Sequence, residues 1–230
     1  MHRLAQIGQS DAYKQQLMVK NLIHDLIVFL VILVILLFIK IPYVNSVLAF
    51  GILIIYAYMR KELASGLGFK RPTNLLKTIG ISLGFAVCMI LLSYFILLPI
   101  IQGFTGQPIN LEAFDQLKGN PNILVTNLAL GWVIGGLMEE TIFRGFMLSA
   151  FMRHLPNRIG ILIGLIFSSS LFGYMHAYQG ISGQILVGLM GLILGIIYVV
   201  YKRNLWFVIF THGFVNTISM LMVYYDVAKP

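Results

Sequence analysis

The sequence predicts an all-α fold, a polytopic transmembrane helical bundle of about seven spans. Among its 230 residues, 59% are hydrophobic and only 10% are charged, whereas about 25% of the residues of a soluble domain are charged. Its mean hydropathy is +0.89. The apolar runs are too long for barrel strands and lack strict alternation, so we expect helices, which satisfy their own backbone hydrogen bonds within a membrane.

Seven apolar runs define the expected helices, because each is long enough, or nearly long enough, to span a bilayer. The sequence contains no repeat, low-complexity tract or soluble domain, so residues 1–230 are expected to form a single membrane domain. The expected spans are, in chain order, Leu22–Ile39, Tyr43–Tyr58, Leu75–Ile101, Ile123–Phe151, Ile159–Tyr178, Ile185–Tyr201 and Leu205–Tyr225.

The basic residues predict the orientation of the bundle. Twelve of the sixteen Lys and Arg residues precede the first span or follow the second, fourth and sixth spans. Lys40, Lys118 and Lys229 lie on the other side, and Arg144 lies within a span. By the positive-inside rule the N-terminus is cytoplasmic and the C-terminus is outside. This alternation also explains the net charge of +8 without nucleic acid as a partner.

Two carboxylates and a guanidinium interrupt the fourth span, in the run Glu139-Glu140-Thr141-Ile142-Phe143-Arg144. Charged side chains within a membrane are costly and usually serve a function. Glu140 and Arg144 are one helical turn apart, so they can partly neutralise each other. Glu139 points about 100° away from Glu140 around the helix. A buried carboxylate without such a partner is suited to act as a general acid or base.

Polar residues also interrupt two later spans. Phe172 is followed four residues later by His176 near one end of the fifth span, and His212 and Asn216 share one face of the seventh. A single histidine on an apolar helix is more often a satisfied core residue than a catalyst. Polar groups on three spans instead favour one shared interior site, where each could find a partner.

These residue types suit the hydrolysis of an acyl bond without a covalent intermediate. A carboxylate and a neutral imidazole can deprotonate a water, while an imidazole N–H and an amide can donate hydrogen bonds to an oxyanion. The sequence lacks the His-Glu-x-x-His motif of zinc proteases and the Gly-x-Gly-Asp motif of aspartyl enzymes. Residues 168–170 are serines, but no Gly-x-Ser-x-Gly motif surrounds them, so we interpret them as packing residues.

The motifs Glu139-Glu140-x-x-x-Arg144, Phe172-x-x-x-His176 and His212-x-x-x-Asn216, in this order, resemble those of the CPBP family. This family, also called Abi, joins CAAX prenyl endopeptidases with bacterial bacteriocin-processing and immunity proteins. The resemblance covers residues 123–225, which would be the catalytic core. It implies a metal-independent, glutamate-dependent intramembrane endopeptidase in a bacterial cell membrane, with a peptide or membrane-protein substrate.

The resemblance also implies a role for each motif residue. Glu139 and His176 would activate the attacking water, and His212 and Asn216 would stabilise the oxyanion. The remaining three residues would support the site: Glu140 and Arg144 its architecture, and Phe172 the packing of the histidine.

The depths of the two histidines present a difficulty. With straight helices, His212 would lie near 10 Å and His176 near 25 Å from the cytoplasmic end of their spans. The two side chains can meet only if a span is tilted or broken, or if its boundaries differ from those expected.

Two other interpretations of the polar residues stay open. Glu139, Glu140, His176 and His212 are plausible ligands for zinc or another divalent ion. Alternatively, the chain is not an enzyme, and its polar residues form a proton or ion relay or support bacteriocin immunity through binding of a peptide or partner.

Other features receive structural interpretations. The longest connection, Gln102–Pro121, is either a lid or a solvated connector, and its glycines and prolines favour the connector. Gly131 and Gly135 offer a small-residue face for close helix packing. His154 is expected to be solvated, and Asn127 to bond to a neighbouring helix outside the site.

Overall fold

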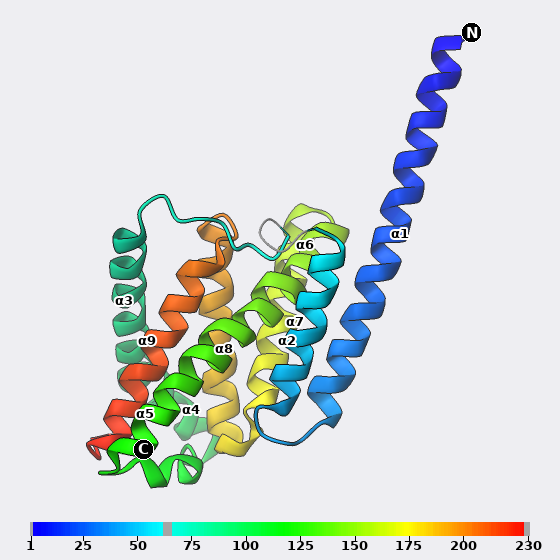
Figure 1. The fold of residues 1–230 in the computed structure, drawn as a ribbon. Helices are drawn as coiled ribbons and strands as arrows, with labels where there is room; N and C mark the ends of the chain where they lie inside the picture. Colours follow the sequence, from blue (N-terminus) through cyan, green and yellow to red (C-terminus); the bar gives the residue numbers. More distant parts are fainter. Residues whose placement is uncertain (1, 62–65, 228–230) are drawn as a thin grey trace.

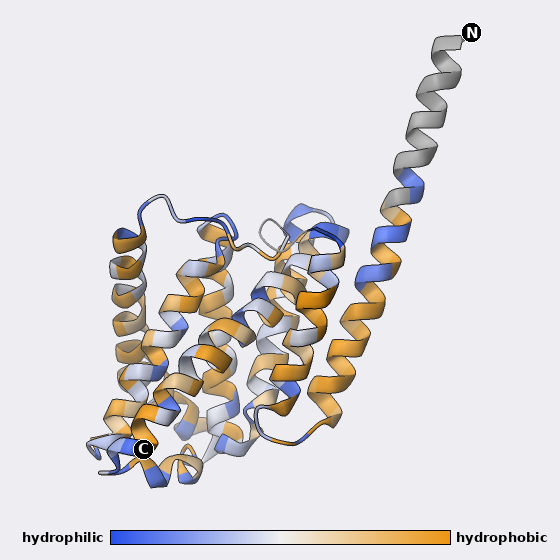
Figure 2. Cartoon of the chain, viewed as in Figure 1, coloured by the Kyte–Doolittle hydropathy of each residue, from blue (hydrophilic) through white to orange (hydrophobic). Residues whose placement is uncertain are grey.

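The computed structural model describes residues 2–61 and 66–227, which form the expected all-helical bundle (Figure 1). By length and composition, six of the described helices could cross a membrane, and α2 is a shorter apolar helix. Apolar residues cover the helices, and hydrophilic residues gather where the chain turns (Figure 2). The prediction of an integral membrane protein with about seven spans is confirmed.

The helices follow one another with short connections. Segments η1, η3 and η4 are π-helical, whereas η2 and η5 are 3₁₀ turns. The bounds are α1 (His2–Phe38), α2 (Val44–Met59), α3 (Leu75–Leu92), η1 (Ser93–Leu97), α4 (Leu98–Thr105), η2 (Glu112–Leu117), α5 (Pro121–Leu130), η3 (Gly131–Glu139), η4 (Thr141–Leu148), α6 (Ser149–His154), α7 (Asn157–Met175), η5 (Ala177–Gln179), α8 (Gly180–Val200) and α9 (Leu205–Tyr224).

Helix boundaries differ from the expected spans at two places. Helix α1 begins at His2 rather than Leu22, and its 37 residues extend about 55 Å, so its N-terminal half projects beyond the bundle (Figure 1). Helix α7 ends at Met175, and α8 begins at Gly180 instead of Ile185. Hydropathy alone misses such helical turns because they carry polar residues.

The connections of the chain lie at two opposite ends of the bundle (Figure 1), and the two sets differ in charge. We call one of them the basic end; it carries the Lys- and Arg-rich connections 60–74 and 201–204 and the connection 155–156, which lies between Arg153 and Arg158. We call the opposite one the outer end; it carries connections 39–43, 106–120 and 176–179 and the C-terminal end of α9. Residues 62–65 and Lys229 lie outside the described residues. The segregation agrees with the predicted orientation, which places the basic end in the cytoplasm.

One continuous helical run, residues 121–154, carries Glu139 and crosses the bundle diagonally from the outer end to the basic end (Figure 1). We call this run the Glu139 helix. It begins with Pro121 after the N-cap Asn120, whose side chain accepts a hydrogen bond from the Ile123 N–H at 3.2 Å. Its middle is π-helical, a rare geometry that occurs frequently at functional sites.

The core lies around the second half of the Glu139 helix. Every residue from 141 to 150 is buried, and α2, α7, α8 and α9 pack around this segment. Phe143 packs edge-to-face on Phe172 of α7, with ring centroids 5.1 Å apart. A Cβ at Gly164 would lie 2.8 Å from Leu148, so this glycine allows α7 to approach closely. The packing therefore holds the helix that carries the charged motif from several sides.

Candidate active site

The bundle encloses a cavity of about 290 Å³. The four predicted catalytic residues, Glu139, His176, His212 and Asn216, all line it, together with Phe172. They come from the Glu139 helix, the end of α7 and α9. The structure therefore brings together side chains that lie up to 77 residues apart in sequence.

The adjacent glutamates of the motif occupy different environments. Glu139 is half-buried and faces the cavity, whereas Glu140 is completely buried behind the cavity wall. Adjacent residues of a helix point in different directions, about 100° apart in an α-helix. Only Glu139 is therefore placed where it could meet a water or a substrate.

Glu140 forms a buried network with Arg144 and His212. Arg144 Nη1 donates to Glu140 Oε1 at 2.9 Å, which confirms the predicted i,i+4 pair. His212 Nδ1 lies 2.8 Å from the same oxygen. Because an ionised carboxylate can only accept, this nitrogen carries the proton. Any proton on His212 Nε2 then makes the ring an imidazolium, with Glu140 as its counter-charge.

Arg144 is held in place by further contacts. Its Nη2 donates to the Gly191 carbonyl oxygen at 2.6 Å, and the guanidinium carbon lies 4.7 Å from the centroid of the Phe172 ring. A Cβ at Gly191 would lie 3.1 Å from Arg144 Nη2 and 2.9 Å from Phe172, so a glycine at this position gives the guanidinium room. The sequence alone does not reveal this role of Gly191.

His176 lies directly after α7, and its ring turns back toward the helix. Its Nδ1 donates to the Phe172 carbonyl oxygen at 2.8 Å, so in the neutral imidazole Nε2 is left as an acceptor. Glu139 lines the same cavity as this ring. A water bonded to both groups would therefore face two acceptors.

The Phe172 ring resolves the difficulty with the depths of the two histidines. Its centroid lies 4.8 Å from that of His176 and 5.8 Å from that of His212. Helix α9 leans across the bundle (Figure 1), and α7 ends just before His176. The two histidines consequently line one cavity, with a phenylalanine between them.

Asn216 is fixed by the small-residue face of the Glu139 helix. Its Nδ2 donates to the Gly131 carbonyl oxygen at 3.0 Å. A Cβ at Gly135 would lie 2.5 Å from the same nitrogen and 3.4 Å from His212 Nε2. An amide has two N–H donors, so one stays available for an oxyanion. Gly131 and Gly135 thus position a site residue, in addition to allowing close packing.

The connection between α4 and α5, residues 106–120, forms part of the cavity wall; we call it the outer loop. Ile109, Leu111, Phe114 and Leu117 of this loop line the cavity. The Thr105 and Ser182 hydroxyls lie 2.7 Å apart and tie the start of the loop to α8. The expectation of a merely solvated connector was therefore wrong, because the apolar residues of the loop pack inward.

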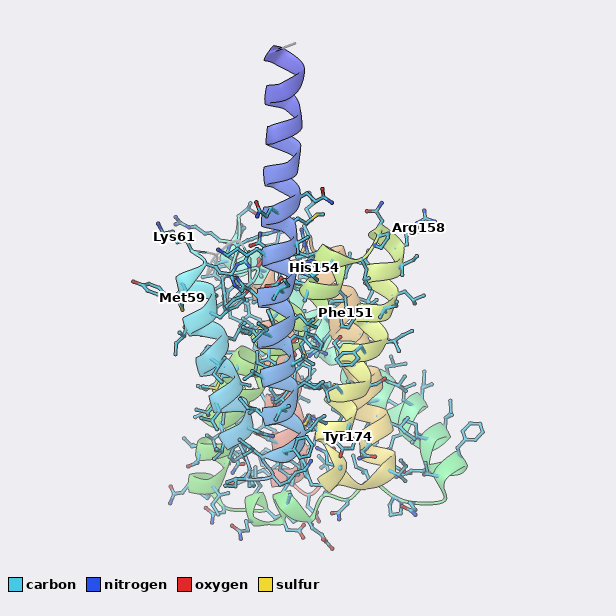
Figure 3. The ribbon with its side chains drawn as sticks, turned by 90° about the vertical axis from the view of Figure 1, so that its right-hand side faces the viewer. Met59, Lys61, Phe151, His154, Arg158 and Tyr174 are labelled. Atoms are coloured by element: carbon cyan, nitrogen blue, oxygen red, sulfur yellow. The ribbon has the colours of Figure 1, made fainter. Side chains whose placement is uncertain are left out.

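A second polar cluster, at the basic end, was not predicted. His154, expected to be solvated, lies with Nε2 2.7 Å from Oδ2 of buried Asp25 on α1. Figure 3 shows His154 and Phe151 beside α1, in agreement with the 5.7 Å between the Phe29 and Phe151 ring centroids. An aspartate inside the first span was the sequence signal that could have revealed this cluster.

Asn127 lines the cavity, but its amide donates to the Ile123 carbonyl oxygen of its own helix at 2.9 Å, rather than to a neighbouring helix as expected. Among the described residues, no three His, Cys, Asp or Glu side chains are grouped as a metal ion would require.

Comparison with known proteins identifies one family. Residues 121–218 match the family model described as Type II CAAX prenyl endopeptidase Rce1-like. The matched segment begins with the Glu139 helix and ends in α9 just after Asn216. It therefore contains all the site residues predicted from the sequence motifs. Neither the curated proteins nor the solved structures include a match.

Proposed function

From the match of residues 121–218 to the Rce1-like family of type II CAAX prenyl endopeptidases, we propose that the chain is a glutamate-dependent intramembrane endopeptidase. The family makes it a membrane protease with a peptide or protein substrate. The proposal adds the mechanism, which uses a water activated by Glu139 and His176 and no metal ion.

Four chemical groups converge on one cavity, and this convergence is the observation that supports the proposal most strongly. A carboxylate, two imidazoles and an amide reach it from three separate helical segments. Burying such groups in a membrane protein is costly unless they share a site. General-base and oxyanion groups facing the same space are what acyl hydrolysis requires.

In the proposed reaction, a water hydrogen-bonds to Glu139 and to His176 Nε2. Its oxygen attacks the carbonyl carbon of the scissile peptide bond while its proton moves to Glu139. The carbonyl oxygen becomes an oxyanion, which accepts hydrogen bonds from Asn216 Nδ2 and from protonated His212 Nε2. When the tetrahedral intermediate collapses, the C–N bond breaks and Glu139 returns the proton to the leaving nitrogen. Such a general base is worth about 10²–10⁴-fold in rate.

Glu140 and Arg144 act behind the site in this mechanism. Glu140 holds His212 Nδ1–H and supplies a negative charge beside the imidazolium that donates to the oxyanion. Arg144 balances this buried carboxylate. Glu140 is thus a positioning residue for His212 and does not touch the substrate.

The test is cleavage of a membrane-peptide library by the purified protein in detergent, read by mass spectrometry. Wild type should cleave, Glu139→Gln should not, and Glu112→Gln, an exposed carboxylate on the outer loop, should cleave like wild type. Each protein is assayed with and without EDTA. Cleavage by Glu139→Gln at the wild-type rate would rule out the mechanism, and loss of cleavage with EDTA would favour the zinc interpretation.

A further inference from the structure

We infer that the cavity receives its substrate from the outer end of the bundle, as an apolar peptide segment at the membrane surface opposite the Lys- and Arg-rich connections. That the occupant of the cavity is a substrate rests on the proposed function. The route into the cavity does not, because it follows from which parts of the chain surround the cavity and which parts close it.

The cavity reaches the outer end at several separate places. Its wall includes Tyr43 in the turn between α1 and α2, the outer loop, Tyr178 and Gln179 between α7 and α8, and Val223 near the end of α9. Every outer-end connection therefore contributes to it. Among the described residues, none from the basic-end connections lines the cavity.

The basic end is closed by the chain that follows α2. Leu67 is only 3% exposed, and a Cβ at Gly145 of the Glu139 helix would lie 2.8 Å from the Leu67 carbonyl oxygen. The Gly68 carbonyl oxygen accepts a hydrogen bond from the Leu205 N–H at 2.8 Å, which fixes the segment to the start of α9. Lys70 Nζ donates to the Lys202 carbonyl oxygen at 2.6 Å. Residues 67–70 are therefore packed against the Glu139 helix, α9 and the connection before α9, across the described part of that end.

A packed layer lies between this closure and the cavity. Along the Glu139 helix, the residues after Arg144 lead from the site to the basic end, and Phe146, Met147 and Leu148 are at most 1% exposed. The hydroxyls of Ser149 and Tyr198 meet there at 3.0 Å. Native interiors of this density contain few voids larger than a water molecule. A substrate approaching from the basic end would have to unfold this layer.

The outer loop is, by contrast, a movable cover. Gly106 and Gly119 stand at its two ends, and each adopts a φ of +66°, which glycine tolerates best. Between them only short segments are regular, and the Lys118 and Asp226 pair that ties the loop to the end of α9 is exposed. Displacing the loop would open the small cluster of Leu117, Leu124 and Val223, but would leave the packed layer at the basic end intact.

The size and lining of the cavity define the substrate. A volume of about 290 Å³ lies near the lower end of the ~300–1,000 Å³ range of ligand pockets, so it holds a short segment, not a folded domain. Most of the wall outside the polar site is apolar and includes Leu186, Val187 and Met190 of α8. By the positive-inside rule, the outer end faces away from the cytoplasm. The substrate is accordingly an apolar segment presented on the extracytoplasmic side.

The first test labels single cysteines with a membrane-impermeant methanethiosulfonate reagent, in a Cys88→Ala background. Ser93→Cys and Ser219→Cys place a thiol on the cavity wall, and Lys118→Cys and Lys202→Cys mark the outer and basic ends. Right-side-out vesicles should label both wall positions and the Lys118 variant, and inside-out vesicles only the Lys202 variant. Labelling of the wall positions from the basic end, or from neither, would overturn the inference, as would an inverted pattern at the two markers.

The second test adds the peptide library to sealed vesicles of each orientation that contain wild type or Glu139→Gln. Cleavage by wild type in right-side-out vesicles and its loss in inside-out vesicles is the expected result. Cleavage only in inside-out vesicles would overturn the inference but leave the protease intact. Loss of cleavage even in detergent would count against the proposed function, and the labelling would still decide the route. Variants are first checked by size-exclusion chromatography for folding.

Discussion

Two buried carboxylates hold the Glu139 helix, one near its middle and one at its basic end, and they differ in how their oxygens are used. Glu140 belongs to the helix itself and is 0% exposed. Asp25 belongs to α1, is 3% exposed, and reaches the end of the helix at His154. Both are charged groups inside a membrane bundle, yet only one of them lies beside the cavity.

Asp25 has partners on both of its oxygens. Tyr56 donates its hydroxyl to Oδ1, with Arg60 Nη1 3.7 Å from the same atom. Arg153 Nη2 lies 3.1 Å and His154 Nε2 2.7 Å from Oδ2. These partners come from α2, its C-terminal end and α6, so the carboxylate joins α1 to two other parts of the bundle. Buried polar groups satisfied in this way make a structure rigid.

Glu140 concentrates its contacts on one oxygen. Both Arg144 and His212 bond to Oε1, while Oε2 is buried and has no hydrogen-bond partner among the described residues. An unsatisfied buried oxygen costs stability, and such exceptions call for an explanation. The comparison leads us to expect a structural role for Asp25 and, under the proposed function, a role for Glu140 in positioning His212.

The largest effect is expected for Arg144→Ala, which breaks the Glu140 pair. Removing one partner of a buried ion pair strands the other charge and costs about 3–5 kcal/mol. We expect a large drop in thermal stability together with loss of cleavage, measured by thermal unfolding in detergent and by the library assay. A variant as stable as wild type would show that Glu140 does not depend on Arg144.

Glu140→Gln should separate activity from stability. The amide keeps the shape of the side chain but removes the negative charge beside His212 Nδ1, which the proposed mechanism requires. Loss of an oxyanion donor typically costs about 10²–10³ in kcat, and we expect a loss of this order with a smaller fall in Tm than for Arg144→Ala. Unchanged kcat would show that Glu140 is structural, like Asp25.

Gly135→Ala tests the cavity side of the same histidine. The new Cβ would stand 2.5 Å from Asn216 Nδ2 and 3.4 Å from His212 Nε2, so it would displace the oxyanion donors while Glu140 stays in place. We expect a fall in kcat of up to about 10². Gly51→Ala, where a Cβ meets nothing within 4 Å, is the matched control and should behave like wild type.

Asp25→Asn should show the opposite pattern to Glu140→Gln. Hydrogen bonds to charged groups contribute about 1.5–3 kcal/mol each, so we expect a lower Tm. At temperatures where the variant stays folded, its cleavage rate should match wild type because no cavity residue contacts Asp25. Loss of activity in the folded variant would mean that the α1 contact shapes the site.

The exposed pair of Lys118 and Asp226 should give the smallest effect. Its hydrogen bond to Asp226 raises the pKa of Lys118 above 10.5. The pair therefore contributes fully to stability at pH values below the pKa that Lys118 has in the unfolded chain. This contribution is lost only as the pH rises through the higher pKa that Lys118 has in the folded protein. Lys118→Gln should leave Tm at neutral pH unchanged, since exposed pairs contribute little. A clear fall in Tm would show that the outer loop supports the whole fold.

The fold and the grouping of the site residues could be predicted because each leaves a strong signal in the sequence. Long apolar runs can only be spans, and the cost of charge in a membrane marks Glu139 and Arg144. The i,i+4 spacing of His212 and Asn216 places them on one face. The family motifs added the role proposed for each residue.

The contacts between segments could not be predicted. Whether His212 meets Glu140 depends on the lean of α9 and on the π-helical geometry of the Glu139 helix, neither of which hydropathy reveals. The inward packing of Phe114 requires knowledge of where the outer loop folds. Asp25 signals a buried partner, but nothing in the chain indicates that His154, beyond the fourth span, is that partner.

The diagonal path of the Glu139 helix makes the protein sensitive to bilayer thickness. Its 34 residues would extend about 51 Å as a straight α-helix, whereas the hydrocarbon core of a bilayer measures about 30 Å. A helix that exceeds the bilayer adapts by tilting, and its tilt changes with the length of the surrounding acyl chains. Because Glu139 lies near the middle of this helix and the other proposed catalytic groups lie on other helices, we expect lipid chain length to change how these groups align.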